Sequence, residues 1–342
     1  MVLHKVGEPF ELEEVPKPQI GPRDALVKVR ACGSGLTIHH TVAGRTPAKL
    51  PLIIGHEIAG EVVELGSEVD DLAIGDRVTV YYYLFCGRCR FCLSRREPLC
   101  ELQPGNVGRA INGGYAEYVR LPAENVLKLP PGLPYDERPA DVAIITDAIA
   151  TPLKVCRRTR VQPTETMVVF GGAGGVGIHL VQMASRVFNA RVIAVDLGPQ
   201  KLTAAVEAGA HETIDAASED PLEGIRRLTN GKGADVIADF VGATQTVSAG
   251  VQGLGTGGRL TILAGAGGGE LTIKAGQTLR GEQEILGSRY VTRQEVHESL
   301  ELVARGLIKP IVNHIFPLEQ ANQAHELVGR SAGIGRVALV ID

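Results

Sequence analysis

The stretch Met167-Val-Val-Phe-Gly-Gly-Ala-Gly-Gly-Val-Gly-Ile-His-Leu-Val-Gln182 decides the fold of this chain. It opens with a short apolar strand, Met167–Phe170, crosses a glycine-rich turn and enters a segment with helical periodicity, Ile178–Phe188. Strands and helices alternate further along the chain, which predicts a parallel α/β sheet in this part of the protein. The other expected elements are strands at Arg191–Val195, Val236–Val241 and Leu260–Leu263, and a helix at Pro199–Ala208.

The turn in this stretch has the G-x-G-x-x-G spacing of a dinucleotide-binding site, with a strand before it and a helix after it. Gly172 permits the tight turn, Gly174 lets the backbone approach a pyrophosphate, and Gly177 lets helix and strand pack closely. The free N–H groups and the dipole at the helix N-terminus favour an anion such as the pyrophosphate. A glycine-rich turn without a ligand is the alternative.

The coenzyme expected at this turn is NAD, because the next strand ends in Asp196. A carboxylate there accepts hydrogen bonds from the ribose hydroxyls and repels the 2′-phosphate of NADP. Lys201 follows at a distance that could reach the ribose. The candidate coenzyme-binding residues are Gly172, Gly174, Gly175, Val176, Gly177, Asp196, Lys201 and Val241.

Four cysteines, Cys86, Cys89, Cys92 and Cys100, lie within one arginine-rich loop. Four thiolates this close together can form a tetrahedral shell around one soft divalent cation, which makes zinc the expected metal. The alternative is a pair of disulfides or a chance grouping.

The composition excludes several classes of protein. The chain has 342 residues, a net charge of −4 and 44% hydrophobic residues, which is typical of a soluble globular protein. It has no basic block, so we expect no nucleic-acid partner. No apolar run approaches the roughly 18 residues of a membrane span, and Met1–Phe10 lacks a signal-peptide pattern. We therefore expect a cytoplasmic protein with no membrane partner, in which cysteines are metal ligands or free thiols.

Together these features resemble the medium-chain, zinc-containing alcohol dehydrogenase family, over essentially the whole chain. Besides the cysteine loop and the glycine turn, the resemblance rests on the motifs Gly55-His56-Glu57, Gly75-Asp76-Arg77-Val78, Gly113-Gly114-Tyr115-Ala116-Glu117-Tyr118 and Asp239-Phe240-Val241-Gly242. It implies an α/β protein whose GroES-like, mostly β catalytic domain at 1–152 is completed by 290–342. A doubly wound parallel-sheet Rossmann domain at 153–289 would bind NAD, with the active site between the two. The cysteine loop would hold a structural zinc.

The resemblance also implies a second, catalytic zinc that polarises the alcohol or carbonyl oxygen. Its ligands in the family are one Cys, one His and a third Cys or Asp, with a Glu beside the His that can exchange in. His56, Glu57 and Asp147 match the last three of these positions.

The expected ligand cysteine is missing. An alignment without gaps places Cys32 at a neighbouring family position and Gly35 at the ligand position. Thr37 and His40 then fall on the hydroxyl and the terminal histidine of the family's proton relay. A rival register makes Cys32 the ligand and Ser34 the relay hydroxyl. His39 is a further possible ligand, and a zinc-free active site is the other alternative.

From this resemblance we expect an enzyme, an NAD-dependent alcohol dehydrogenase with zinc as Lewis acid, in which Thr37, His40, His56 and Asp147 are the catalytic residues. The substrate would be a small alcohol, secondary or hydrophobic, or the matching carbonyl compound. Tyr82, Ile111 and Tyr290 are candidates to line its pocket. The alternative is a metal-free reductase of enones or quinones that keeps only the structural zinc. The family pattern further implies a homodimer or homotetramer.

Overall fold

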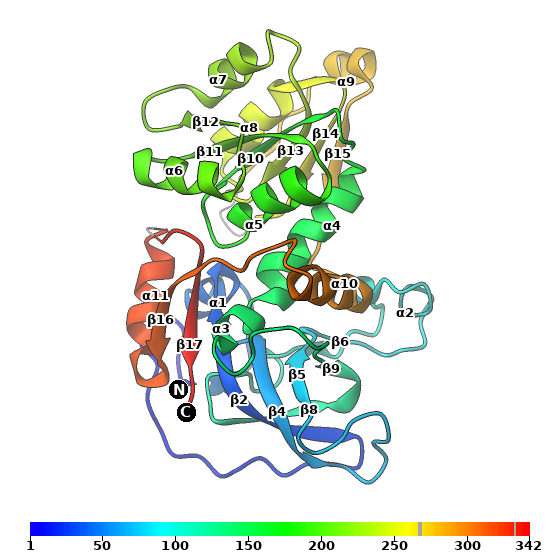
Figure 1. The fold of residues 1–342 in the computed structure, drawn as a ribbon, viewed down its shortest axis with the longest axis vertical. Coiled ribbons are helices and arrows are strands. Elements are labelled where there is room, and N and C mark those ends of the chain that lie inside the picture. The colour runs from blue at the N-terminus through cyan, green and yellow to red at the C-terminus, as the bar shows by residue number, and fades with distance from the viewer. Residues whose placement is uncertain (266–268, 332) are drawn as a thin grey trace. The chain divides into compact units, whose positions relative to one another are not determined.

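The computed structural model describes residues 1–265, 269–331 and 333–342, and the chain divides into two compact units (Figure 1). The first unit comprises residues 1–150, 291–306 and 310–342. The second comprises residues 151–290 and 307–309. The last part of the chain therefore returns to the unit in which the chain begins.

The second unit is built on a six-stranded sheet in which every pair of neighbouring strands is parallel. The strand order is β12-β11-β10-β13-β14-β15, which is the doubly wound order that reverses next to the first strand. Its strands β10, β11 and β13 consist mostly of apolar residues because both of their faces are buried. The strands of the sheet are β10 Thr166–Phe170, β11 Arg191–Asp196, β12 Glu212–Asp215, β13 Ala234–Asp239, β14 Leu254–Ile262 and β15 Glu284–Gly287.

Helices follow the strands of this sheet, as Figure 1 shows, and buried apolar side chains, mostly Val, Ile and Leu, form the core of this unit. The helices are α5 Gly177–Gln182, α6 Pro199–Ala208, α7 Pro221–Leu228, α8 Thr244–Gln252 and α9 Ala275–Gly281, with a π-helical turn at Met183–Val187 after α5.

The first unit is built on a mostly antiparallel sheet with the order β16-β17-β2-β4-β5-β9, in which β8 also pairs with β2. Its strands are β2 Asp24–Ser34, β4 Glu57–Leu65, β5 Arg77–Val80, β8 Tyr118–Pro122, β9 Val126–Lys128, β16 Val312–Pro317 and β17 Arg336–Val340. Two small two-stranded sheets pair β1 Val2–Leu3 with β3 Leu52–Ile53 and β6 Tyr83–Leu84 with β7 Gly105–Asn106.

The helices of the first unit are short, apart from α10 and α11. They are α1 Leu36–Val42, α2 Arg90–Leu93, α3 Pro139–Ala143, α10 Arg293–Ala304 and α11 Ala321–Gly329, with 3-10 turns at Glu97–Leu99, Ala123–Asn125 and Leu318–Gln320. A π-helical turn, Ile145–Ile149, follows α3 and leads directly into α4 Ala150–Thr159. Such turns disturb the regular helix and often occur at functional sites; this one contains Asp147.

The predicted fold class is confirmed, with differences at the ends of elements. The alternation of residues in the first third of the sequence also predicts a strand at Arg77–Tyr83. This strand ends at Val80, where the side-chain amide of Asn125 donates to the backbone carbonyls of Tyr81 and Tyr83. The strand expected at Leu260–Leu263 begins earlier, at Leu254.

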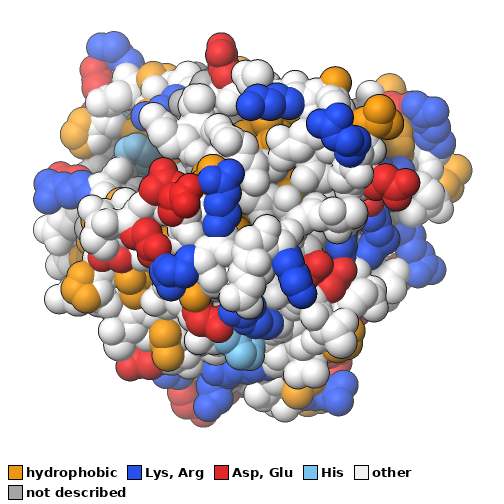
Figure 2. Space-filling model, turned by 90° about the horizontal axis from the view of Figure 1, so that it is seen from above, with side chains coloured by type: hydrophobic (Ala, Val, Ile, Leu, Met, Phe, Trp, Pro, Cys, Tyr) orange, Lys and Arg blue, Asp and Glu red, His pale blue; other side chains and the backbone are white. Residues whose placement is uncertain are grey.

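Two observations concern the surface. None of the helices in the described ranges is long and apolar enough to cross a membrane. On the face seen in Figure 2, acidic and basic side chains are interspersed.

Candidate active site and metal sites

The glycine turn joins β10 to α5 and depends on glycine at two points. Gly171 has a φ of +75°, in the left-handed region that favours glycine. A Cβ atom on Gly177 would overlap the carbonyl group of Gly171, with only 2.9 Å to its carbon. The first turn of α5 can therefore lie against the end of β10 only with glycine at position 177.

Asp196, at the end of β11, fixes this turn. Its two carboxylate oxygens accept hydrogen bonds from the backbone N–H groups of Ala173 and Leu197, each at 2.9 Å. Lys201 lies 3.2 Å from the same carboxylate, so this predicted ribose contact is also an ion-pair partner. The structure thus brings the predicted glycine turn, Asp196 and Lys201 together.

The remaining predicted coenzyme residues border the same turn. Val241 donates its backbone N–H to Asp239 at 2.8 Å, and its side chain lies near Gly171. The carbonyl of Gly175 accepts a hydrogen bond from His179 at 2.8 Å, and Val176 precedes the first residue of α5.

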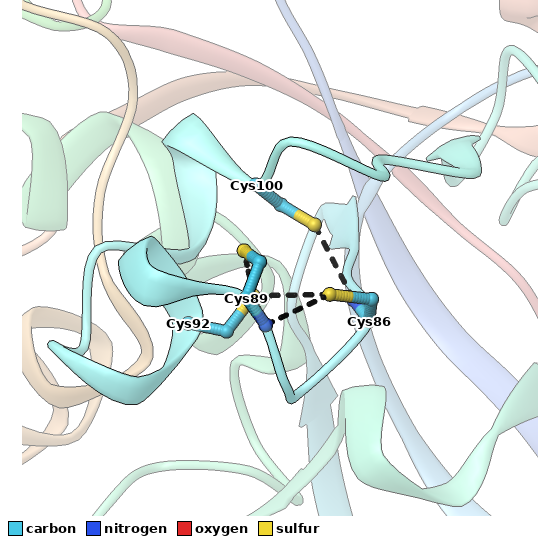
Figure 3. A group of neighbouring side chains, drawn as sticks. All are labelled: Cys86, Cys89, Cys92 and Cys100. Carbon is cyan, nitrogen blue, oxygen red and sulfur yellow. Dashed lines mark hydrogen bonds between the residues drawn. The ribbon is translucent and has the colours of Figure 1, made fainter.

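The four loop cysteines converge, as Figure 3 shows, and all are free thiols. The sulfur of Cys92 lies 3.9 Å from that of Cys86 and 3.5 Å from that of Cys89. Sulfurs around a tetrahedral zinc, each about 2.3 Å from the metal, are about 3.8 Å apart. The cluster therefore has the dimensions of a four-thiolate metal site and is one of the groups that could hold an ion.

Backbone N–H groups support these sulfurs. Cys86 donates to the sulfur of Cys100 and Cys89 donates to that of Cys86, each at 3.4 Å. Backbone N–H groups, that of Cys92 first, lower the pKa of Cys89 to about 6. The backbone thus favours the thiolate, the form that binds metals, at Cys86 and Cys89, whereas burial raises the pKa values of Cys92 and Cys100.

A second group that could hold a metal, called the acidic cluster below, lies in the first unit. It contains His56, Glu57 and Asp147, all buried. Each residue offers one ligand atom, and these atoms all lie within 4.8 Å of one another. Nε2 of His56 is 3.5 Å from Oδ2 of Asp147. The structure therefore brings together the three residues that the sequence predicted as ligands. The ring of Tyr82 lies beside His56, with 4.4 Å between the ring centroids.

Arg336, at the start of β17, is the functional residue that sequence reasoning missed. Its guanidinium forms two parallel hydrogen bonds to the carboxylate of Glu57, with 2.9 Å from Nε to Oε2. It also donates to Oδ2 of Asp147 at 3.3 Å. The residue is only 5% exposed. The one available signal was Gly35, where a missing side chain leaves space for another group.

The charges in this cluster depend on one another. Burial raises the pKa of Glu57 to about 7, and the guanidinium of Arg336 opposes that rise. Burial lowers the pKa of Arg336, but Glu57 and Asp147 raise it above its ordinary value overall. Arg336 is therefore a permanent cation whose charge is shared between two carboxylates.

The two alignments put different residues at the position of the expected ligand cysteine, Gly35 in one and Cys32 in the other. The structure shows which of the two lies beside the acidic cluster. Cys32 is fully buried in the core of the sheet, and its sulfur lies 3.6 Å from the carbonyl oxygen of Gly33. It is not part of the group formed by His56, Glu57 and Asp147. A Cβ atom on Gly35, in contrast, would point at the guanidinium of Arg336. The geometry supports the ungapped alignment, with Gly35 at the position of the expected ligand.

The predicted relay residues lie on α1. The carbonyl of Thr37 accepts from the hydroxyl of Thr41 at 3.1 Å, and Nδ1 of His40 accepts from Arg45 at 3.2 Å. His39, the possible substitute ligand, lies 3.2 Å from His325 and is not in the group with His56.

Comparison with known proteins identifies the family. The model of the alcohol dehydrogenase GroES-like domain matches residues 21–131, and that of the zinc-binding dehydrogenases matches residues 175–305. An alcohol dehydrogenase of Geobacillus stearothermophilus is 34% identical over 349 residues, covering 100% of this chain and 99% of that protein. An NAD-dependent alcohol dehydrogenase of Sulfurisphaera tokodaii is 33% identical and covers 99% of both chains.

The solved structures agree. The alcohol dehydrogenase of Aeropyrum pernix has a TM-score of 0.91 at 31% identity, covering 99% of this chain and 98% of that one. The predictions of enzyme class, NAD as coenzyme and zinc binding are confirmed together with the predicted family. The chain belongs to the medium-chain, zinc-containing alcohol dehydrogenase family.

Proposed function

We propose that this chain interconverts an alcohol, secondary or hydrophobic, and its aldehyde or ketone by hydride transfer to and from NAD. The observation that carries the proposal is the Gly171–Gly177 turn closed on the carboxylate of Asp196. The coenzyme supplies the hydride chemistry, and the protein supplies binding and orientation. Asp196 would select NAD through the ribose hydroxyls.

The metal sites are treated separately. Cys86, Cys89, Cys92 and Cys100 would hold a structural zinc, supported by the sulfur distances and the backbone N–H groups around them. The residues at His56 do not fit the catalytic zinc that the family implies. Two of the three donors, Glu57 and Asp147, already bind a buried guanidinium, and Gly35 offers no thiolate. We therefore derive no catalytic step through a metal at this site.

The proton would leave through Thr37 and His40, as the family's relay suggests. Burial lowers the pKa of His40, with further contributions from Arg45 and His39. The imidazole is therefore neutral at pH 7 and can accept the proton of an alcohol before passing it to solvent.

A second candidate function is the reduction of enones or quinones by the same hydride chemistry. The observation that favours it is the buried ion pair of Arg336 with Glu57 and Asp147. A guanidinium can donate hydrogen bonds to a developing oxyanion, but it cannot ionise an alcohol by coordination. The aromatic ring of Tyr82 beside His56 suits a hydrophobic substrate in either case.

Two further features are proposed on the family pattern alone. They are a cytoplasmic location and a homodimer or homotetramer.

The deciding experiment compares NAD(H) with NADP(H) on a panel of secondary alcohols, ketones, enones and quinones. We expect turnover of alcohols and ketones with NAD(H). Asp196→Asn removes the charge that repels the 2′-phosphate, so the preference for NAD in kcat/KM should fall at least about tenfold, or 1.4 kcal/mol.

Asp215→Asn is the matched control, because Asp215 ends the next strand of the same sheet and also accepts backbone N–H groups. It should leave the coenzyme preference unchanged. Turnover of enones or quinones alone would replace the first function by the second, and a wild-type preference for NADPH would contradict the role given to Asp196.

A further inference from the structure

The end of β2 and the residue that follows it place two glycines beside the cluster of His56, Glu57 and Asp147. Gly33 and Gly35 lie two residues apart in extended backbone, so their missing side chains would share one face. A Cβ atom on Gly33 would lie 2.9 Å from Cδ of Glu57, and one on Gly35 would lie 2.5 Å from Cζ of Arg336. Ser34, between them, and Cys32, before them, are both buried. The missing side chains leave the space that the buried ion pair fills.

The pairing of β17 with β2 places Arg336 opposite Gly35. In this antiparallel ladder Val337 pairs with Ser34 and Ala338 pairs with Gly33. The next position along each strand is Arg336 on β17 and Gly35 after β2. The backbone register therefore places the guanidinium of Arg336 where a side chain at position 35 would otherwise lie.

The carboxylates of Glu57 and Asp147, which could bind a metal ion here, already form ion pairs with Arg336. Arg336 bonds to both oxygens of Glu57 and to one of Asp147, and its side chain is 6% exposed. A buried guanidinium requires such partners, because breaking a buried pair leaves an uncompensated charge. A divalent ion would have to displace a permanent cation and would find no thiolate at Gly35.

We infer that the pair Gly35–Arg336 replaces the catalytic zinc, so that an arginine supplies the fixed positive charge of this site and a second zinc does not bind. The inference rests on the proposed function and bears on the choice between its two candidates, because a guanidinium cannot ionise an alcohol by coordination and so favours the reduction of an enone or quinone. The guanidinium keeps its protons and compensates the buried carboxylates of Glu57 and Asp147 in place of a metal ion.

The test is the number of zinc ions per chain, measured by elemental analysis of the full-length protein produced with zinc and dialysed. We expect one zinc in the wild type, held by the cysteine loop. Two zincs in the wild type, the second lost in Asp147→Asn, would overturn the inference.

Two variants then test whether a zinc site forms when position 35 carries a cysteine and Arg336 is removed. Gly35→Cys combined with Arg336→Ala restores the thiolate and removes the cation, so the count should rise to two. Leu36→Cys with Arg336→Ala is the matched control; Leu36 is 42% exposed, and the count should stay at one. A count of one in the Gly35→Cys, Arg336→Ala variant would contradict the claim that this pair keeps zinc out.

Gly35→Cys alone should stay at one zinc and melt at a lower temperature, because its side chain overlaps the guanidinium. A count of two in this variant would also contradict the claim. If the combined variant does not fold, the wild-type count decides by itself. A wild type with one zinc and no turnover would contradict the proposed function while leaving this inference standing.

Discussion

Gly177 begins α5 where its backbone lies against Gly171, and the space for a single methyl group is absent there. We expect Gly177→Ala to push the helix away from β10. This should cost about 1–3 kcal/mol in unfolding free energy, as overpacking does elsewhere. NADH binding should weaken as well if, as proposed, the pyrophosphate lies at this helix N-terminus. Thermal melting and NADH fluorescence titration measure both effects.

Two other glycines separate these effects. A Cβ atom on Gly174 would approach the carbonyl oxygen of Gly171 only to 3.3 Å, so Gly174→Ala should weaken NADH binding with little loss of stability. Gly287, on β15, has open space around it, and Gly287→Ala should change neither. Equal NADH affinity in the wild type and Gly174→Ala would refute the close approach of backbone to pyrophosphate.

At the scale of residues, His56, Glu57 and Asp147 were predicted as neighbours because each matches a ligand position in a motif of the family that the chain resembles. Arg336 could not be predicted in the same way. It reaches the cluster through the pairing of β17 with β2, which joins residues about 300 positions apart in the sequence. A charged residue before an apolar strand ordinarily indicates a solvent-exposed strand end. Only the empty position at Gly35 indicated that another group fills the site.

At the scale of elements, β10, β11, β13 and α6 were predicted closely, because strand and helix periodicities are local properties. The edge strands β12 and β15 were not predicted. The segment after β5 was not predicted either. The side-chain amide of Asn125 donates hydrogen bonds to the backbone carbonyls of Tyr81 and Tyr83, each at 2.8 Å. This buried amide ends the strand. Nothing near Tyr81 in the sequence points to Asn125, so the break depends on tertiary structure.

The cysteine loop is an element whose stability should depend on its metal. Cys89→Ser removes one thiolate from a cluster with the spacing of a zinc site. We expect the loss of one zinc per chain and a fall in melting temperature of more than about 5 °C, because metal binding contributes folding free energy. NADH affinity should be kept, because the glycine turn belongs to the other unit.

Cys156→Ser is the matched control for this loop. Cys156 is buried in α4 and belongs to neither metal cluster, so this variant should keep its zinc. Equal zinc content in the wild type and Cys89→Ser would exclude the loop as the zinc site.

At the scale of the whole molecule, part of the fold cannot be predicted from the order of the elements along the chain. The strands β16 and β17 complete the sheet begun by β2, with the second unit inserted between them along the chain. Periodicity can identify β17 as a strand, but its partner follows only from the family pattern or the structure. The site at Arg336 therefore depends on how the chain returns, and that information is absent from any local window.

The stability of the whole chain should fall as the pH is lowered from 7 towards 4.5, partly through His325. Burial lowers the pKa of His325 to about 4, with a smaller contribution from His39, which lies 3.2 Å away. The unfolded chain then binds more protons than the native chain between about pH 6.5 and 4, so stability increases with pH across this window. Its share is on the order of 1–2 kcal/mol after allowance for partial exposure.

His325→Gln should remove that share and flatten the dependence, as measured by urea unfolding at intervals from pH 4.5 to 7.5. Glu57 acts in the opposite sense, since its raised pKa makes the native state bind the extra proton, so the difference between wild type and variant is the relevant quantity. His4→Gln is the control. His4 is exposed and its pKa is raised by its hydrogen bond to Glu13, so its loss should not flatten the profile. Parallel profiles for the wild type and His325→Gln would show that burial of this imidazole does not contribute to acid sensitivity.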